Sequence, residues 1–360
     1  MYMPVSLRAI CFFLLFSILL FSFSFPASAY SFLPSVSAKS AVLIDASTGK
    51  IIFEKSAELR MPMASTTKIM TALCALEHAD FKAPVYVDPR AVGIEGSSAY
   101  LKAGERLTVE ELLYCLMLSS ANDAAAAIAY AISGSIDEFA SLMNEKAREL
   151  GLANTHFDNP HGLDSKNHYT TALDLANLTR YALQNKKFAK IVATNSMQIE
   201  NGVSSHSLYN HNRLLRTYRG CIGVKTGYTK VSGRCLVSAA ERDGLRLICV
   251  TLNAPDDWND HTALLDYGFS NFYAQKLCAV AESFYEIPVV SGESGRAFCV
   301  AAKALYLTRA LGDEGEVSCT VECERFLWRL PKNGEKLGQL VFKIDGKTVA
   351  TVDLVAHIIV

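Results

Sequence analysis

Residues 62–71 read PMASTTKIMT, and the interpretation of the whole chain starts from this stretch. Apolar residues recur at helical spacing from Ile69 onward, which predicts a helix that begins around Ser65. Residues three apart share a helix face, so the Lys68 amine can reach the Ser65 hydroxyl. A serine hydroxyl is a weak nucleophile that needs an adjacent base. A lysine can act as that base when burial and nearby cations lower its pKa. The pattern Ser-x-x-Lys therefore predicts a serine nucleophile with a lysine base.

Taken alone, Ser-x-x-Lys is a weak signal. The chain contains a second copy, from Ser47 to Lys50, between two short strand-like runs, where turn chemistry explains the serine and the glycine. Without further motifs, Ser65 would be interpreted as the N-cap of its helix and Lys68 as a solvated side chain.

Ser120-Ala121-Asn122 is the second pattern, Ser-x-Asn, and it lies between two predicted helices. The first of these helices begins with a Thr108/Glu111 capping box and ends near Ser119. The second is rich in alanine from Ala124 onward, and Asn122 or Asp123 is a candidate cap for it. In a short interhelical loop, Ser120 could relay a proton and Asn122 could bind Lys68 and the substrate backbone.

The triplet Lys225-Thr226-Gly227 occurs once, in a predicted strand. At an edge strand the lysine offers a positive charge and the threonine a hydroxyl for a carboxylate. The glycine lets the backbone approach a ligand closely. The simpler interpretation is a solvated strand end.

In this order the three patterns form the set found in penicillin-binding proteins and serine β-lactamases. The chain resembles the low-molecular-mass D-alanyl-D-alanine carboxypeptidases over nearly its whole length after residue 29. Segments that carry the resemblance are 40–45, 62–71, 120–124, 161–164, 169–172 and 223–229.

The resemblance implies roles for eight residues. Ser65 would attack the carbonyl between the terminal D-alanines of a peptidoglycan stem peptide, Lys68 would accept its proton, and Ser120 would protonate the departing D-alanine. The substrate-binding residues would be Asn122, Lys225, Thr226, Gly227 and Tyr228. The backbone N–H groups of Ser65 and Tyr228 would form the oxyanion hole, and β-lactam antibiotics would acylate Ser65. His161 and Asp174 also match family positions. We interpret them as a loop residue satisfied by backbone and as an acid in the first turn of a helix.

Helices around antiparallel strands predict an α+β fold, a β-lactamase/transpeptidase-like domain of an antiparallel sheet flanked by helices. The predicted hairpin turns at Asp243-Gly244 and the last helix runs from His261 to Phe272. From Ala274 short β-rich runs follow one another. The predicted domains are therefore a signal peptide over 1–29, a serine D,D-peptidase domain over 30–273 and a β-rich domain over 274–360.

The first 29 residues have the pattern of an export signal. Arg8 precedes an apolar run, and Ala27-Ser28-Ala29 provides a cleavage site. The alternative is an uncleaved anchor, although the run is shorter than the ~20 residues that span a bilayer. We therefore expect an extracytoplasmic protein. The final stretch, residues 349–360, lacks a basic helical face, so attachment to the membrane by a helix in the interface stays open.

Charge and cysteines narrow the choice of partners. The chain has 35 basic and 36 acidic residues, which gives no basic excess for nucleic acid. Nine cysteines follow the signal segment, an odd number, and we expect few or no disulfides. Cys319 and Cys323 lack the spacing of a zinc site, and neither a metal nor a cofactor is implied.

Three alternatives remain at this stage. A class A β-lactamase needs a further glutamate to activate water, and no convincing Glu-x-x-x-Asn segment lies between Ser120 and Lys225. A D,D-endopeptidase would use the same catalytic atoms. A non-catalytic wall-binding protein would not need the intact set of motifs.

Overall fold

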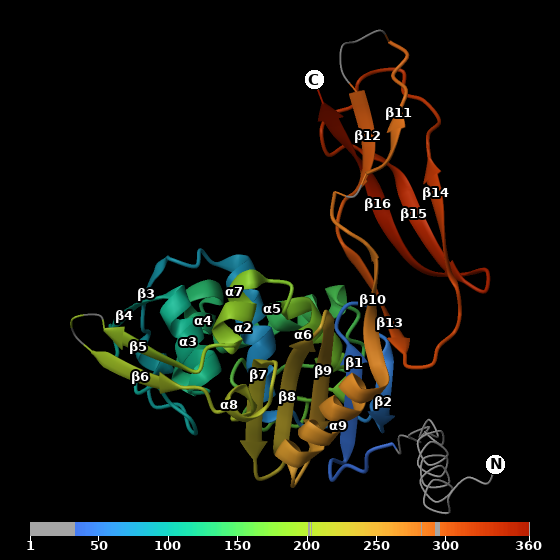
Figure 1. The fold of residues 1–360 in the computed structure, drawn as a ribbon. Coiled ribbons are helices and arrows are strands. Elements are labelled where there is room, and N and C mark those ends of the chain that lie inside the picture. Colours follow the sequence, from blue (N-terminus) through green and yellow to red (C-terminus); the bar gives the residue numbers. More distant parts are fainter. Residues whose placement is uncertain (1–32, 201, 203, 282, 292–295, 360) are drawn as a thin grey trace, which may run out of the picture. The chain divides into compact units, whose positions relative to one another are not determined.

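The computed structural model describes residues 33–200, 202, 204–281, 283–291 and 296–359. The predicted signal peptide lies outside these residues. Among the described helices, none combines the length and apolar character needed to cross a bilayer. Both helices and antiparallel sheets are present (Figure 1), so the α+β prediction is confirmed.

A five-stranded antiparallel sheet organises residues 40–252. Its strand order is β2-β1-β9-β8-β7. The bounds are β1 Ser40–Asp45, β2 Ile51–Lys55, β7 Cys221–Thr229, β8 Gly233–Arg242 and β9 Leu245–Leu252. The β8–β9 hairpin turns at Asp243-Gly244 as predicted, and Cys249 pairs with Ser238. β7 is therefore an edge strand of this sheet, with one side available to a neighbouring segment.

Both faces of this sheet are covered. Every residue of β1 is buried. Val42 and Ile44 face one hydrophobic cluster, whereas Ala41 and Leu43 face a second. Side chains alternate between faces along a strand, so one buried strand serves two cores. Helix α9, Asp257–Asn271, packs on the second face, to which the short helix α8, Leu214–Thr217, adds Leu214, and the remaining helices gather on the first (Figure 1).

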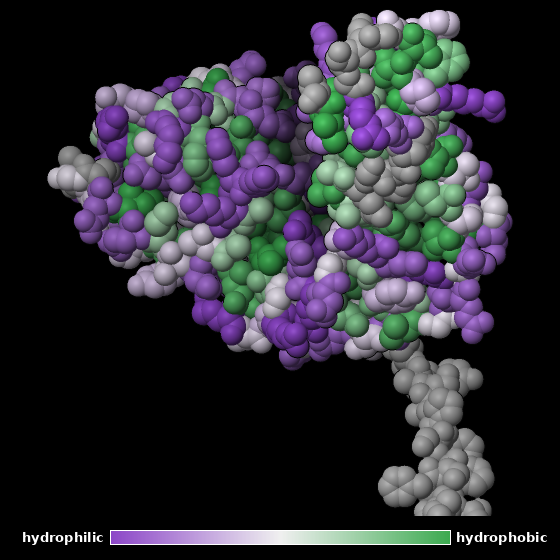
Figure 2. Space-filling model, turned by 45° about the horizontal axis from the view of Figure 1, so that its top comes forward, coloured by the Kyte–Doolittle hydropathy of each residue, from purple (hydrophilic) through white to green (hydrophobic). Residues whose placement is uncertain are grey.

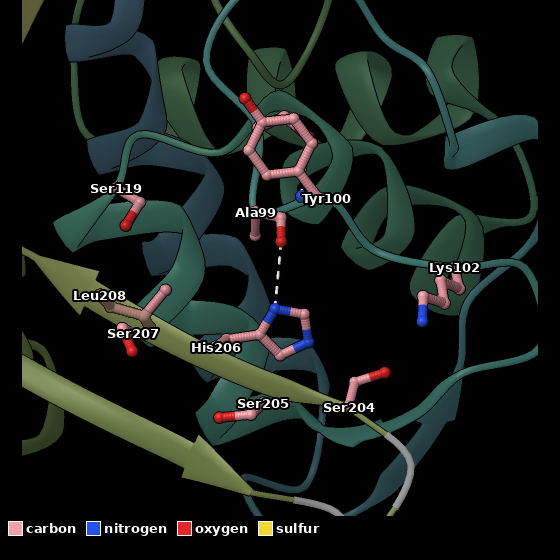
Figure 3. A pocket seen from close by; sticks show the side chains of 10 residues that line it. Ala99, Tyr100, Lys102, Ser119, Ser204, Ser205, His206, Ser207 and Leu208 are labelled. Atoms are coloured by element: carbon pink, nitrogen blue, oxygen red, sulfur yellow. Dashed lines mark hydrogen bonds between the residues drawn. The ribbon is translucent and has the colours of Figure 1, made fainter.

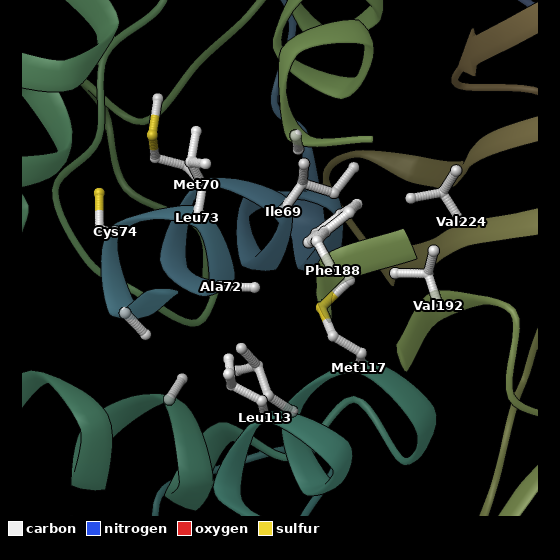
Figure 4. Close-up of a cluster of buried hydrophobic side chains, with 14 of the residues drawn as sticks. Ile69, Met70, Ala72, Leu73, Cys74, Leu113, Met117, Phe188, Val192 and Val224 are labelled. Atoms are coloured by element: carbon white, nitrogen blue, oxygen red, sulfur yellow. The ribbon is translucent and has the colours of Figure 1, made fainter. Parts of the chain in front are cut away.

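The helices of the first face surround α2, Lys68–His78. They are α3 Val109–Leu118, α4 Asn122–Ser133, α5 Ile136–Glu149, α6 Ala172–Ala182 and α7 Lys186–Val192. Figure 4 shows residues of α2 packed among side chains from α3, α7 and β7. Because α2 is buried on nearly all sides, the side chains of its first turn are fixed by the core.

Short elements complete this part of the chain. They are the 3₁₀ turns η1 Ala64–Thr67 and η2 Pro89–Ala91, and the strand pairs β3 Pro84–Tyr86 with β4 Arg106–Thr108 and β5 Ser196–Glu200 with β6 Ser205–Tyr209. Several of them lie around the candidate site. None of the four strands in these pairs was predicted from the sequence.

The C-terminal segment is almost entirely strand. β10 Phe272–Cys278 pairs with β13 Leu305–Ala310. A second sheet has the order β11-β12-β16-β15-β14, with bounds Ser283–Ile287, Arg296–Ala301, Lys347–Ile359, Lys336–Ile344 and Val317–Cys323. It encloses its own hydrophobic cluster, which includes Leu340 and Leu354. The prediction of a β-rich C-terminal part is confirmed.

Three local predictions need correction. The helix expected from Ser65 begins as the 3₁₀ turn η1 and becomes α-helical at Lys68. Helix α4 begins at Asn122 and has no side-chain cap, because the Asn122 side chain bonds to other segments instead. The last helix begins at Asp257, four residues before the predicted start, directly after a turn at Pro255 and Asp256. The Thr108/Glu111 capping box is present as predicted.

The molecular surface mixes hydrophilic and apolar residues. Figure 2 shows hydrophilic residues spread over this face of the molecule, with apolar residues in smaller groups between them. The nine described cysteines are thiols, and none of them forms a disulfide with another described residue.

Candidate active site

The Lys68 amine is the centre of the site. The side chain is fully buried, and Nζ lies 2.9 Å from Ser65 Oγ. The same nitrogen lies 2.6 Å from Asn122 Oδ1 and 2.5 Å from the backbone oxygen of His161. A neutral amine has two N–H groups and one lone pair. With Asn122 and His161 accepting the two N–H groups, the lone pair is directed to the Ser65 hydroxyl.

The electrostatics of the site favour that neutral amine. Burial lowers the pKa of Lys68 well below its usual value, the charge of Lys225 lowers it further, and Asp123 opposes the shift. Desolvation disfavours the charged form of a lysine, and a like charge acts in the same direction. Burial and Lys225 therefore favour the neutral amine, the form of Lys68 that can accept a proton from Ser65.

The loop that carries His161 is tied to the start of α2. Thr71 Oγ1 donates to the Pro160 oxygen at 2.6 Å. Gly162 has a φ of +87°, and a Cβ at this position would lie 2.0 Å from the Ala64 oxygen. This close backbone contact requires glycine. It holds the His161 carbonyl against Lys68.

The His161 ring bonds to its own loop. Its Nδ1 accepts from the backbone N–H of Leu163 at 3.3 Å, as expected for a loop residue satisfied by backbone. Burial and the charge of Lys68 lower the pKa of His161 to about 3, so the ring is neutral. Asp174 accepts from Asn154 N and Thr155 Oγ1, in the first turn of α6. Its carboxylate therefore holds the loop before the His161 segment.

Ser120 and Lys225 form the second half of the site. Lys225 Nζ donates to Ser120 Oγ at 3.0 Å and to the Thr226 oxygen at 2.9 Å. Burial lowers the pKa of Lys225 to about 7. Ser120 has a φ of +58°, a left-handed conformation that is costly for a residue with a side chain. Such conformations concentrate at functional sites, where the surrounding structure holds them in place.

β7 passes very close to the nucleophile. A Cβ added at Gly227 would lie 3.0 Å from the backbone nitrogen of Ser65. Thr229, at the end of the same strand, donates from Oγ1 to Asp164 Oδ1 at 2.9 Å. This bond links β7 to the loop that carries His161. The strand and the 3₁₀ turn η1 therefore stand side by side, with room between them only because residue 227 has no side chain.

A pocket of about 310 Å³ opens over these groups. Of the predicted residues, Ser65, Ser120, Thr226, Gly227 and Tyr228 line it. Lys68 and Lys225 are buried and reach Ser65 and Ser120, and Asn122 reaches Lys68. All eight residues proposed from the sequence therefore belong to one constellation.

The sequence analysis did not find five further lining residues, which are Ser97, His211, Arg234, Asp257 and Trp258. None belongs to a short motif. Arg234 could have been suggested by the β7–β8 hairpin, in which it pairs with Tyr228. Among the described residues, no group of three histidine, cysteine, aspartate or glutamate side chains could hold a metal ion.

Comparison with known proteins gives the same assignment. Residues 27–256 match the family model of D-alanyl-D-alanine carboxypeptidases (peptidase S11), and residues 272–358 match that of the penicillin-binding protein 5 C-terminal domain. D-alanyl-D-alanine carboxypeptidase DacF of Bacillus subtilis is 35% identical over 323 residues, 87% of this chain and 83% of that protein. DacA of Escherichia coli is 32% identical over 333 residues, 88% of this chain and 82% of that protein.

Solved structures extend the comparison to the fold. Penicillin-binding protein 5 of Haemophilus influenzae aligns with a TM-score of 0.71 and 27% identity, over 90% of this chain and 98% of that one. The Streptomyces K15 DD-transpeptidase aligns with a TM-score of 0.63 and 33% identity, over 66% of this chain and 99% of that one. With two family models covering successive segments and the motif residues converging on Ser65, the chain belongs to the peptidase S11 family of D-alanyl-D-alanine carboxypeptidases.

Proposed function

We propose that the protein is a serine D-alanyl-D-alanine carboxypeptidase that removes the terminal D-alanine from peptidoglycan stem peptides. The observation that carries the proposal is the environment of Lys68 Nζ, which lies 2.9 Å from Ser65 Oγ and has Asn122 Oδ1 and the His161 backbone oxygen as its other two partners. A lysine held in this way is a general base of the kind that a serine nucleophile requires.

In the acylation step, Ser65 Oγ attacks the carbonyl carbon of the penultimate D-alanine and its proton passes to Lys68 Nζ. The carbonyl oxygen becomes an oxyanion, which the backbone N–H groups of Ser65 and Tyr228 would stabilise. The carbon–nitrogen bond then breaks. Ser120 supplies a proton to the departing amine of D-alanine and can regain one from Lys225, 3.0 Å away.

Before the deacylation step, Lys68 returns to its neutral form by losing to solvent the proton that it took from Ser65, and Lys225 regains a proton from solvent. A water then attacks the acyl-enzyme and passes a proton through Lys68 to the Ser65 oxygen, which leaves as a hydroxyl. Lys225 and Thr226 would bind the terminal carboxylate of the substrate, which restricts the reaction to free chain ends. β-Lactam antibiotics would acylate the same oxygen. Asn122 would hold both Lys68 and the substrate backbone.

We also propose that the protein acts outside the cytoplasm after cleavage near residue 29, with a domain boundary near residue 273. Support for the boundary comes from the end of α9 at Asn271 and the start of β10 at Phe272. Mass spectrometry of the mature N-terminus and limited proteolysis around residue 273 would test the two points.

The central test is intact-mass spectrometry after brief exposure to benzylpenicillin, with peptide mapping of the adduct. We expect one adduct, on Ser65, and release of free D-alanine from stem pentapeptides. Rapid penicillin turnover without a long-lived adduct would indicate a β-lactamase instead. Cleavage of dimeric muropeptides in preference to release of D-alanine would indicate a D,D-endopeptidase.

A further inference from the structure

A buried histidine–carboxylate pair lies next to the candidate active site. His206, on β6, faces the loop that precedes β4, and Figure 3 shows its ring below the backbone of Ala99. Nδ1 lies 3.0 Å from the Ala99 oxygen, and Nε2 lies 2.7 Å from Glu105 Oε1. The His206 and Glu105 side chains are only 8% and 1% exposed. The proposed reaction uses neither residue.

The geometry requires one extra proton on this pair. The Ala99 carbonyl oxygen can only accept, so Nδ1 must carry a hydrogen. A neutral imidazole then has a lone pair on Nε2, and that lone pair would face a carboxylate oxygen. Two acceptors at 2.7 Å repel each other, so the pair must hold a further proton between Nε2 and Oε1. The second Glu105 oxygen, Oε2, accepts from the Lys102 backbone N–H at 3.0 Å.

The segment held by His206 forms a wall of the catalytic pocket, and we call residues 95–101 the wall loop. Asn122 donates from its backbone N–H to the Ser97 oxygen and from Nδ2 to the Glu95 oxygen, at 2.7 and 2.5 Å. Ser97 itself lines the pocket over Ser65. The wall loop is thus bonded to the residue that orients Lys68.

The wall loop is fixed from two sides. On the α4 side, the Asp123 carboxylate accepts from the backbone N–H groups of Ala99 and Leu101, both at 3.0 Å. On the β6 side, His206 binds the oxygen of the same Ala99. One peptide segment is therefore held between a carboxylate and an imidazole. Loss of either contact frees one side of the loop.

Several charged and titratable groups of the described residues surround the pair. Lys102 lines the cavity of about 490 Å³ between the wall loop and β6. Asp123 is buried on α4, and Arg106 is exposed on β4. Cys115 on α3 is close enough that Glu105 contributes to raising its pKa, although burial is the main cause, and the thiol is neutral. Glu200, at the end of the neighbouring strand β5, is exposed.

We propose that the protonated His206–Glu105 pair is a clasp that positions the wall loop, which makes both residues positioning residues for the reaction at Ser65. The clasp is closed while the pair holds its extra proton and opens when that proton is lost. Its role in catalysis rests on the proposed function of Ser65, whereas its effect on the wall loop does not. The clasp would couple the geometry of Asn122 to external pH.

Glu105→Gln tests the clasp by reversing its proton requirement. The side-chain amide introduced by this substitution can donate to Nε2 of a neutral His206 while its oxygen still accepts from Lys102 N. In the variant, the clasp closes when the imidazole is neutral and opens when it is protonated. If the pair has a purely structural role, the variant should lose the same amount of loop protection and activity at every pH. The direction of the pH effect therefore distinguishes the clasp from a structural role.

Two readouts should be compared with the wild type at each pH between about 5 and 9, the range in which a histidine can titrate. Amide hydrogen exchange at Ala99 and Leu101 reports the wall loop without reference to activity. The rate of Ser65 acylation by a fluorescent penicillin reports its effect on the site. In Glu105→Gln we expect exchange to be about tenfold faster and acylation about tenfold slower than in wild type at acidic pH, since a buried donor then lacks a partner. Both differences should shrink or reverse at alkaline pH.

Matched variants complete the test. Glu110→Gln makes the same chemical change at a carboxylate that pairs with Lys82. Its exchange rate and its acylation rate, each divided by the wild-type rate, should not change with pH. His206→Ala removes the clasp, so exchange should be faster than in the wild type at acidic pH, and the difference should shrink at alkaline pH, where the wild-type clasp opens. The clasp is excluded if the exchange and acylation rates of Glu105→Gln, each divided by the wild-type rate, are the same at every pH. If hydrogen exchange in the variants changes with pH as expected but neither the wild type nor any variant is acylated, the function at Ser65 is overturned and the clasp remains supported.

Discussion

Lys225 Nζ donates to Ser120 Oγ at 3.0 Å, although the two residues are separated by 105 positions in the sequence. Both side chains are buried, and Ser120 is held in a left-handed conformation. The bond joins the edge strand β7 to the loop between α3 and α4. The same lysine lowers the pKa of Lys68, after the larger effect of burial. The buried Lys225 amine therefore joins β7 to the loop that carries Ser120 and also affects the pKa of Lys68.

Lys225→Met should stabilise the fold at neutral pH while abolishing activity. Burial lowers the pKa of Lys225 from 10.5 to about 7, so between these values the unfolded chain binds more protons than the folded one. Stability from this group then rises with pH by about 1.4 kcal/mol per pH unit. Methionine has no charge to desolvate. The free energy of unfolding of Lys225→Met should therefore exceed that of the wild type most near pH 7, and the excess should shrink as the pH rises toward 10.5.

Urea unfolding at several pH values between about 7 and 9 measures that difference. Lys230→Met, at an exposed position just beyond the same strand, is the control and should show no such trend. An advantage of Lys225→Met that stays constant or grows with pH would contradict the assignment.

Lys68→Arg should be as inactive as Lys68→Met. A guanidinium stays protonated in proteins, so it has no lone pair to accept the Ser65 proton. Removal of a general base costs about 10²–10⁴-fold in rate. We expect a loss of that size in the rate of labelling by a fluorescent penicillin, with circular dichroism as the check on folding. Rapid labelling of Lys68→Arg would show that charge, rather than proton acceptance, is what Lys68 provides.

Gly162→Ala should damage both stability and acylation. The position has a φ of +87°, and the new Cβ would meet the Ala64 oxygen. Gly93 has a similar φ of +78°, but no atom lies within 4 Å of the position that a new Cβ would take. Gly93→Ala therefore carries only the backbone cost, about 1 kcal/mol. We expect Gly162→Ala to exceed that cost by at least ~2 kcal/mol in chemical denaturation.

The two glycine variants should also differ in activity. Only Gly162→Ala is expected to slow acylation, because it displaces the His161 carbonyl from Lys68. Equal losses in stability and in acylation rate for both variants would mean that the contact with Ala64 does not matter.

His261→Gln should reduce the sensitivity of the fold to acid. His261 is buried between Ser238 Oγ and Thr251 Oγ1, at 2.6 and 2.9 Å, and burial lowers its pKa from 6.5 to about 3. The folded pKa is depressed, so the unfolded chain takes up a proton first as the pH falls below 6.5. Between these two pKa values, this group therefore costs about 1.4 kcal/mol of stability for each unit that the pH falls.

Glutamine does not titrate in this range. The difference in free energy of unfolding between the wild type and His261→Gln should therefore narrow as the pH falls from 6.5 to about 4.5. Guanidinium unfolding across that range measures it. His156→Gln, at an exposed histidine, provides the comparison. A gap that widens on acidification would be inconsistent with a buried neutral imidazole.

Local sequence patterns determined a large part of this protein. The Thr108/Glu111 capping box and the Asp243-Gly244 turn depend on residues only a few positions apart, so their chemistry is readable without the fold. The three motifs were recognisable for the same reason, because each spans at most four residues. The β-rich character of the C-terminal segment likewise follows from local alternation and turn residues.

Tertiary structure decided what those local patterns could not. Asn122 was a plausible helix cap, yet its side chain serves Lys68 and Glu95 because the fold brings them within hydrogen-bond distance. Ser97 and the His206–Glu105 pair gave no sequence signal, since each depends on contacts with distant segments. Burial, which sets the pKa values of Lys68 and Lys225, is also a property of the packed core alone. The sequence thus supplied the reactive groups, and long-range packing determined their protonation states and their partners.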